Sequence, residues 1–293
     1  MFNYEHTPNS LVVQRFLNMF INNFVAKARP ASGRLHLSPM SEQSSSKLRI
    51  LGVIPARLSS TRLVRKVLLE IVGRPMIEWV WRAAVESGRI DEVVVATDSV
   101  EVESACNLRG IPVIMTSPEC ASGSDRVWEV ARKMPADIYV NIQGDEPLLT
   151  PEHFAPLLAL FARPEVDVAT LAVRCPATDI SNPNAVKVVT AADDRALYFS
   201  RATIPFDRDG VGFAGYRKHL GIYAYRKAAL EQFAALPPSW IETVERLEQL
   251  RLLDNGIDIY VANAPGDTIG VDTEEDLRRV EEILRSRAGS ARP

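Results

Sequence analysis

From about residue 48 onward, short apolar runs alternate with longer stretches in which apolar residues recur at helical spacing. The runs RILGVIPA (49–56) and DEVVVATD (91–98) have apolar centres, which is typical of strands covered on both faces. Residues 75–88 form a helical pattern that closes on a glycine, and its apolar stripe consists of Ile77, Val80, Trp81 and Ala84. This succession predicts an α/β fold with a mostly parallel, twisted sheet and helices on both faces.

The same pattern continues to the end of the chain. In the first half we expect helices at 100–110 and 124–134 and one beginning at Pro151, and strands at 111–116 and from residue 137. In the second half we expect strands at 166–173, 185–190, 219–226 and 257–264, and helices at 240–255 and 273–287. The strands at 185–190 and 219–226 could pair antiparallel around residues 196–206. These elements predict one domain over residues 48–293, with an inserted β-rich lobe at about 180–235.

The first 47 residues need a separate interpretation. Residues 11–26 form an amphipathic stretch, and a polar segment, SEQSSSK, leads into the first strand. An organelle-targeting peptide, a membrane-surface helix and sequence upstream of a start at Met40 are all compatible with this pattern. The segment is therefore left out of the fold prediction. The chain has no apolar run of about 18 residues, so no membrane span is predicted.

Composition argues against some classes of function. The formal net charge of −3 argues against general affinity for nucleic acid, which requires a dense cationic surface. The three cysteines are an odd number without C-x-x-C spacing, so we expect them to be reduced and the protein to be cytoplasmic. No Ser/His/Asp or Cys/His arrangement is apparent, which favours direct displacement over covalent catalysis.

The loop after the first strand (55–66) concentrates positive charge in an acidic chain. It contains Arg57, Arg62, Arg65 and Lys66, together with three hydroxyl side chains. Arginine binds phosphate oxygens in pairs and lysine adds a point charge, so a triphosphate would suit this loop. A solvated basic loop is the alternative. The position directly after a buried strand favours the phosphate site, because ligands bind at the carboxyl ends of parallel strands.

Two acidic residues follow other strands. Asp145 lies in the turn QGDEP (143–147), where Gly144 allows close backbone approach, and Asp272 follows the last predicted strand. Mg²⁺ takes oxygen ligands and usually shares them with phosphates, so the two aspartates could hold one metal ion. For each alone, a turn or N-cap role is the alternative, above all for Asp272, which precedes a helix.

Other polar residues have open interpretations. The segment Ser122–Gly–Ser–Asp–Arg126 either caps a helix or binds a nucleobase or phosphate. Arg201, Arg217 and Lys218 put cations on the lobe, where arginine would match the carboxylate of a sugar acid. His219 would bond a sugar hydroxyl or belong to the core. The charged residues of 240–255 are expected to be mostly solvated.

These loops, in this order, resemble the CMP-Kdo synthetases (3-deoxy-manno-octulosonate cytidylyltransferases) over residues 51–283. The motifs that carry the resemblance are IPARLSSTRL, VVVATDS, SGSDR, VNIQGDEP, NPNAVKVV, ALYFSRATIPFDRD, RKHLGIYAYR, LEQLR and GVDTEEDL. The resemblance implies a nucleotide-diphospho-sugar transferase-like fold and the transfer of CMP from CTP to Kdo for lipopolysaccharide biosynthesis. It also implies Mg²⁺ as cofactor and a homodimer.

The resemblance also implies roles for individual residues. It implies a CTP site formed by Arg57, Ser60, Arg62, Lys66, Ser122, Gly123, Arg126 and Gln143. It implies magnesium ligands at Asp145 and Asp272, and catalytic roles for Arg62, Lys66 and Asp145. The residues it implies for the sugar acid are Arg201, His219, Tyr223 and Glu245.

The chain departs from the family after STRL. The family usually reads Pro-Gly-Lys-Pro-Leu there, whereas this chain reads Val64-Arg-Lys-Val-Leu68. Lys66 is retained, but the Pro-Gly turn is not, so we predict a less rigid triphosphate loop in which Arg65 adds charge. Activation of another acid sugar, such as a sialic acid or an amino-Kdo, and a non-catalytic nucleotide-binding paralogue are the alternatives.

Overall fold

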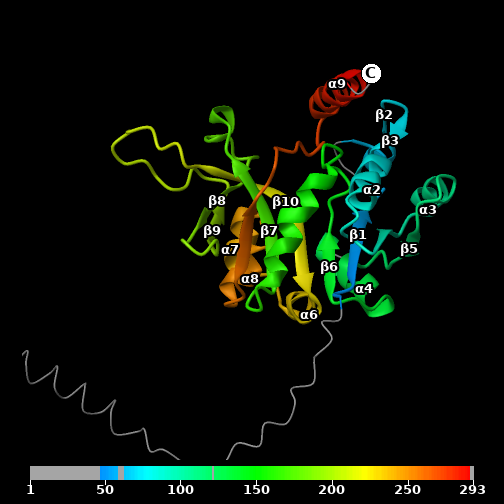
Figure 1. The fold of residues 1–293 in the computed structure, drawn as a ribbon, viewed down its shortest axis with the longest axis horizontal. Helices are drawn as coiled ribbons and strands as arrows, with labels where there is room; N and C mark the ends of the chain where they lie inside the picture. The colour runs from blue at the N-terminus through cyan, green and yellow to red at the C-terminus, as the bar shows by residue number, and fades with distance from the viewer. Residues whose placement is uncertain (1–46, 59–62, 121, 291–293) are drawn as a thin grey trace, which may run out of the picture. The chain divides into compact units, whose positions relative to one another are not determined.

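A nine-stranded sheet forms the centre of the part of the chain that the computed structural model describes, residues 47–58, 63–120 and 122–290. Seven strands follow the order β11-β7-β10-β6-β1-β4-β5, and β8 and β9 extend the sheet beside β10 (Figure 1). The strand bounds are β1 Ile50–Ala56, β4 Glu92–Thr97, β5 Val113–Met115, β6 Ile138–Asn141, β7 Val168–Arg174, β8 Lys187–Thr190, β9 Ala196–Ser200, β10 Arg217–Arg226 and β11 Ile259–Asn263.

The pairings agree with the predicted mostly parallel sheet. β1 pairs in parallel with β4 and β6, β4 with β5, and β7 with β11. β10 is antiparallel to both β6 and β7. Strand β10 also pairs antiparallel with β8, as expected for residues 185–190 and 219–226.

Alternation along β1 shows why its run is almost entirely apolar. Ile54 and Ala56 pack into one hydrophobic cluster, with apolar residues of α2 and α5, whereas Leu51 and Val53 pack into a second cluster with α4 and α6. Both faces of the strand are therefore buried under helices. A third cluster joins Ile71 and Met76 to Val280 of α9.

Most predicted helices are present, with small shifts at their ends. The helices are α2 Met76–Glu86, α3 Val100–Asn107, α4 Gly123–Lys133, α5 Phe154–Ala159, α6 Lys227–Ala235, α7 Trp240–Glu245, α8 Leu250–Asp254 and α9 Glu274–Ser290. The segment from Pro151 begins as a short 3-10 turn, η2 Pro151–His153, before α5. Thr273 rather than Asp272 caps α9, because its hydroxyl accepts a bond from the Asp276 N–H at 3.2 Å. Among the described helices, none is long and apolar enough to cross a membrane.

The single helix predicted at 240–255 is wrong. Arg246 has φ 52° and ψ 51°, a left-handed conformation that ends α7, and α8 begins only at Leu250. The expectation of mostly solvated charges is also wrong here, since Glu242 and Arg251 are buried and bonded at 2.5 and 2.8 Å. The break matters because it turns residues 246–249 toward the cavity described below.

Several elements were not predicted. Helix α6 is one, and a two-stranded hairpin of β2 Glu70–Ile71 and β3 Arg74–Pro75 is another. Strand β9 lies within the segment expected as a connection, and it pairs with β8 to form a hairpin inside the proposed lobe. The next strand, β10, runs from this hairpin into the middle of the sheet, and the described residues from Lys47 onward form one compact unit.

Candidate active site

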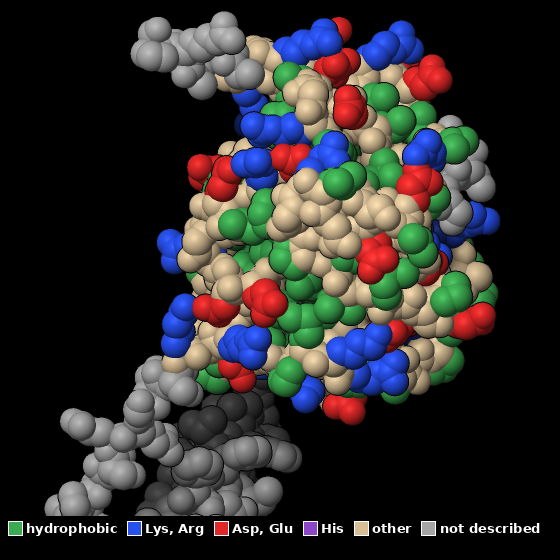
Figure 2. Space-filling model, turned by 90° about the vertical axis from the view of Figure 1, so that its right-hand side faces the viewer, with side chains coloured by type: hydrophobic (Ala, Val, Ile, Leu, Met, Phe, Trp, Pro, Cys, Tyr) green, Lys and Arg blue, Asp and Glu red, His purple; other side chains and the backbone are tan. Residues whose placement is uncertain are grey.

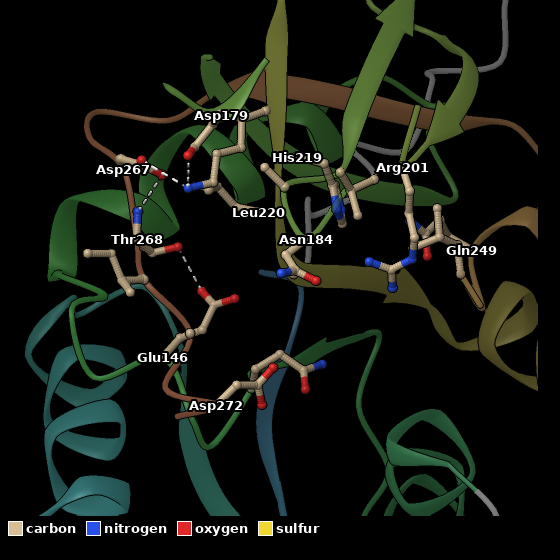
Figure 3. Close-up of a pocket in the computed structure, with 18 of the residues that line it drawn as sticks. Glu146, Asp179, Asn184, Arg201, His219, Leu220, Gln249, Asp267, Thr268 and Asp272 are labelled. Carbon is tan, nitrogen blue, oxygen red and sulfur yellow. Dashed lines mark hydrogen bonds and ion pairs between the residues drawn. The ribbon is translucent and has the colours of Figure 1, made fainter. Parts of the chain in front are cut away.

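A cavity of about 790 Å³ opens beyond the end of β6 (Figure 3). Its walls come from segments far apart in the chain: the turn after β6, the start of α4, strand β10, the α7–α8 break and the segment before α9. The carboxyl ends of β1 and β6 lie side by side in the sheet, as the parallel register Val53↔Asn141 requires. Loops that follow these strands therefore meet at one edge, the usual ligand position of such sheets.

Lys66 joins the two predicted metal ligands. Its Nζ lies 2.5 Å from Oδ2 of Asp145 and 3.1 Å from Oδ1 of Asp272, and Asp272 lines the cavity. Burial alone would lower the pKa of Lys66, but the charges and hydrogen bonds of the two aspartates outweigh it and raise the pKa. Residues 66, 145 and 272, distant in the sequence, thus form one charged cluster.

The backbone around this cluster explains how the aspartates meet. The N–H of Val271 donates to the carbonyl of Asp145 at 2.9 Å, which joins the turn after β6 to the segment before α9. At Gly144, an added Cβ would lie 3.1 Å from the carbonyl oxygen of Pro55. A side chain there would be tight against the end of β1, so glycine lets the turn close on that strand.

The donor set fits Mg²⁺ when substrate oxygens complete it. Among the described residues, no group of three or more His, Cys, Asp or Glu side chains is placed to hold a metal ion. Two carboxylates nevertheless suit Mg²⁺, which usually keeps waters and binds through one or two carboxylates plus phosphates. The ammonium of Lys66 already lies between the two carboxylates, at the place where a cation would be stabilised.

The predicted phosphate loop is described in part. Ser60 and Arg62 lie outside the described residues. Arg57 donates a hydrogen bond to the carbonyl of Cys120 and so ties the loop to the segment before α4. Arg65 has φ 59°, the left-handed conformation that glycine adopts most easily, and it pairs with Glu101 of α3.

The segment at the start of α4 caps that helix and also borders the cavity, while its binding of a nucleobase or phosphate stays a prediction. Ser122 forms a capping box with Asp125 at the start of α4, while Gly123 and Ser124 line the cavity. Gln143, expected nearby, also lines the cavity. Arg126 does not: its side chain is fully buried and donates to Thr116 and, at 3.2 Å, to Asp98.

The structure separates the sugar-acid candidates. Arg201 lines the cavity, and its Nε donates to the carbonyl of Glu245 at 2.7 Å. The Glu245 carboxylate accepts bonds from the Ser200 hydroxyl at 2.6 Å and the Arg201 N–H at 2.9 Å, and it is not among the lining residues. Glu245 therefore orients Arg201, and the neighbouring Glu248 and Gln249 reach the cavity instead.

His219 and Tyr223 both line the cavity from β10. Burial lowers the pKa of His219 to about 3, so the ring is neutral at physiological pH. Its Nε2 lies 3.1 Å from the hydroxyl of Thr170, and its ring meets Phe199 edge-on at 5.1 Å. His219 therefore packs against core side chains and also faces the cavity, while its bond to a sugar hydroxyl stays a prediction.

Sequence reasoning missed several cavity residues. Asn141 Oδ1 and Gln249 Nε2 are buried without a hydrogen-bond partner in the part of the chain that is described, and both residues line the cavity. Burial and the charge of Asp145 raise the pKa of Glu146 to about 7. A polar Asn141 at the end of an apolar strand was the available signal. Gln249 gives no such signal, because the pattern of residues 240–255 predicts a continuous helix.

Lys218 was expected to offer a cation to the sugar and instead bridges two carboxylates. Its Nζ lies 3.1 Å from both Asp179 and Asp267 (Figure 3). Arg217, beside it, donates to Thr190 at 3.0 Å and Asn263 at 2.9 Å and is not among the cavity-lining residues. Arg201 and Lys218 thus both line the cavity, but the Nζ of Lys218 already pairs with two carboxylates, so Arg201 is the better candidate for the carboxylate of a sugar acid.

Comparison with known proteins agrees with this geometry. Residues 51–259 match the family model described as cytidylyltransferase. A 3-deoxy-manno-octulosonate cytidylyltransferase of Acidobacterium capsulatum is 66% identical over 242 residues, covering 83% of this chain and 99% of that protein. One from Koribacter versatilis is 54% identical over 259 residues, covering 88% and 99% respectively.

A solved structure agrees as well. A CMP:2-keto-3-deoxy-manno-octonic acid synthetase complexed with CTP superposes with a TM-score of 0.78 at 43% identity, covering 82% of this chain and 99% of that one. A nucleotidyl transferase at 18% identity and TM-score 0.55 shares the fold.

The sheet and its edge of cationic and acidic loops define a nucleotidyltransferase of the cytidylyltransferase type. Within that class, the chain belongs to the 3-deoxy-manno-octulosonate cytidylyltransferase family.

Proposed function

We propose that this enzyme transfers CMP from CTP to the anomeric hydroxyl of 3-deoxy-D-manno-octulosonate (Kdo) and releases pyrophosphate. The observation that carries the proposal is the cluster of Lys66, Asp145 and Asp272 beside a cavity whose other end is lined by Arg201 and His219. One end suits a metal-bound triphosphate, and the other suits an acidic, polyhydroxylated sugar. The product would activate Kdo for lipopolysaccharide biosynthesis.

The reaction would be an in-line attack on the α-phosphorus, which depends on positioning and charge neutralisation. Mg²⁺, held by Asp145 and Asp272, would supply positive charge at the α-phosphate and acidify the attacking hydroxyl. Lys66 would leave the carboxylates for the phosphate oxygens, with Arg57 and Arg62 as further cations for the departing pyrophosphate. Phosphate oxygens are strong acceptors for ammonium and guanidinium groups.

Arg201 is the proposed partner of the sugar carboxylate. Three of its N–H groups donate to carbonyls, those of Pro183, Glu245 and Arg246, and a guanidinium has five in all. These bonds hold the group in one orientation at the cavity wall. Bidentate pairing with a carboxylate would use its remaining N–H groups.

The cavity wall offers the sugar hydroxyls both a hydrogen-bond acceptor and a hydrogen-bond donor. Asn141 offers a buried acceptor oxygen and Gln249 a buried amide donor, both on the cavity wall. A buried polar atom without a partner costs about 1–3 kcal/mol, and a ligand hydroxyl would remove that cost. Neutral His219 and Tyr223 complete this end of the site.

Pyrophosphate release tests the proposal directly. The assay contains CTP, Mg²⁺ and Kdo, and each component is omitted in turn. We expect release only when all three are present, and no release with the complete mixture would contradict the function. Replacement of Kdo by sialic acid or amino-Kdo in parallel assays distinguishes another acid sugar as the true substrate.

We also propose a homodimer. The segment between β9 and β10 projects from the sheet (Figure 1) and exposes apolar side chains, with Phe206 82% and Val211 81% exposed. Trp240 and Val244 of α7 are exposed as well, at 78% and 64%. Large contiguous apolar patches mark association surfaces, and these side chains are the candidates for one. Analytical ultracentrifugation of wild type and Phe206→Glu would test this, with a monomeric wild type as the contrary result.

The proposed location is the cytoplasm. Cys106, Cys120 and Cys175 are all free thiols, which suits a reducing compartment, and burial raises the pKa of each.

Nucleic acid is not among the proposed partners. On the face shown in Figure 2, basic and acidic side chains are interspersed, which is not the pattern of a nucleic-acid surface.

A further inference from the structure

The segment between β11 and α9 borders the cavity and carries Asp272. We call residues 266–272 of this segment the strap. It has no strand pairing, since β11 ends at Asn263 and α9 begins at Glu274. Val271 is fully buried in the third hydrophobic cluster and the Asp272 N–H donates to Oδ2 of Asp276 at 3.1 Å, whereas the Asp272 side chain itself is 49% exposed. The position of its carboxylate therefore also depends on the side chains that hold the rest of the strap.

Contacts occur along the whole strap. The carbonyl of Gly266 lies 3.1 Å from Nε2 of His153, and Asp267 lies 3.1 Å from Nζ of Lys218. The Thr268 hydroxyl donates to Oε2 of Glu146 at 3.0 Å (Figure 3). Further along, the N–H of Val271 bonds the carbonyl of Asp145. The strap is thus attached on one side to β10 and on the other to the turn after β6.

The bond from Thr268 to Glu146 has a special place among these contacts. Glu146 follows Asp145 directly, and Thr268 precedes Asp272 by four residues. The two bonded residues are 9% and 4% exposed, so water competes little for either partner. Loss of such a buried bond would leave both polar groups unpaired, which costs free energy.

The need for these contacts follows from the charges. When Lys66 turns to a phosphate, Asp145 and Asp272 lose the cation that lies between them and repel each other. The backbone bond from Val271 and the strap contacts then have to keep the carboxylates close enough for one divalent cation. Side chains that orient metal ligands typically change metal affinity by about 10–100-fold when they are altered.

We infer that the strap, held by Thr268–Glu146 and Lys218–Asp267, sets the position of Asp272 for divalent-cation binding. Thr268, Glu146, Lys218 and Asp267 are positioning residues, because they act through Asp272. The inference rests on the proposed function for the identity of the metal-bound substrate.

The test measures Mn²⁺ binding to the full chain by electron paramagnetic resonance, with CTP present and Kdo absent, so that no turnover occurs. We expect Thr268→Val to weaken Mn²⁺ binding about tenfold, since valine keeps the shape and removes the hydroxyl. Thr268→Ser should restore the affinity to within about twofold of wild type. Thr190→Val is the matched control, because it removes a threonine hydroxyl on β8 that accepts a hydrogen bond from the charged side chain of Arg217 on β10.

Lys218→Met gives a second test, in which two explanations predict opposite changes in the affinity for Mn²⁺. Removal of a positive charge near the site should tighten cation binding if only electrostatics matters. Loss of the strap contact should weaken it instead, by about threefold or more. This variant also keeps the inference testable if Thr268→Val does not fold.

Each outcome decides one of two claims. Wild-type affinity in Thr268→Val, tighter binding in Lys218→Met, or no Mn²⁺ binding by the wild type would each overturn the inference. Normal Mn²⁺ binding by the wild type without pyrophosphate release in the presence of Kdo would overturn the proposed function. The inference about the strap would still stand in that case.

Discussion

Lys66 and Lys218 make the same kind of contact on two different kinds of backbone. The Nζ of Lys66 lies 2.5 and 3.1 Å from Asp145 and Asp272, and that of Lys218 lies 3.1 Å from both Asp179 and Asp267. In both cases burial alone would lower the pKa of the lysine, and the paired carboxylates outweigh it. As ion triads, the two clusters are nearly equivalent.

The backbone segments that carry the two lysines differ. Lys66 starts η1 Lys66–Leu68, a short turn after the left-handed Arg65, and its partners lie in two more irregular segments. Lys218 lies in β10, where it pairs with Val173 of β7 and Lys187 of β8. A lysine on an irregular segment can move toward a ligand, whereas a lysine on a paired strand keeps its backbone position even though its partners Asp179 and Asp267 lie in irregular segments. We therefore propose that Lys66 takes part in the chemistry and that Lys218 has a supporting role.

The largest expected effect comes from Asp145→Asn. The change removes a carboxylate that would face the metal, so we expect a loss of more than about 3 kcal/mol of transition-state stabilisation, or over about 100-fold in kcat/KM. Steady-state pyrophosphate release at varied Mg²⁺ measures it. Asp179→Asn is the matched control at the Lys218 cluster, with an expected change of less than about threefold at saturating Mg²⁺. Equal losses in the two variants would remove the distinction between the clusters.

The next effect concerns His219, the neighbour of Lys218 on β10. Its pKa is about 3 in the folded protein and about 6.5 when unfolded, so between these values the unfolded state binds more protons. The free energy of unfolding should then fall as the pH drops, by about 2 kcal/mol between pH 8 and pH 5. Urea unfolding of wild type and His219→Gln measures this, and the variant should lack that part of the pH dependence. Identical pH dependence in both would show that His219 is not buried in its neutral form.

The smallest effect concerns the loop that carries Lys66. A left-handed conformation costs a non-glycine residue about 1–2 kcal/mol, and Arg65 occupies it with φ 59°. The double change Val64→Pro with Arg65→Gly should stiffen the loop and lower KM for CTP by up to about fivefold, or raise kcat. The pair between Arg65 and Glu101 opposes part of this gain. Val64→Pro alone is the control, because it leaves Arg65 strained, and unchanged kinetics in the double variant would contradict the idea.

The parallel half of the fold could be predicted because its signals are local. Strand β1 reads as a continuous apolar run since both faces are covered, and α2 shows one clear apolar stripe. The meeting of Lys66, Asp145 and Asp272 followed from the rule that carboxyl ends of parallel strands share an edge. The residue-by-residue roles at CTP, Mg²⁺ and the sugar remain predictions.

The features that the sequence did not predict depend on tertiary contacts. Nothing local marks Arg246 as the end of α7, because only the fold of the chain around it favours a left-handed arginine there. That break moved Gln249 into the cavity and left Glu245 bonded to Arg201. Arg126 looked like a ligand-binding cation, but its partner Asp98 lies at the end of another strand, 28 positions away. Such partners become visible only when the chain is folded.

The most direct test of the account is a crystal structure with CTP and Mg²⁺ bound. The account predicts one Mg²⁺ coordinated by carboxylate oxygens of Asp145 and Asp272 at about 2.0–2.1 Å, with Lys66 moved from the aspartates to a phosphate oxygen. Lys218 should still bridge Asp179 and Asp267 in that structure. A triphosphate bound elsewhere, with Lys66 still between Asp145 and Asp272, would contradict it.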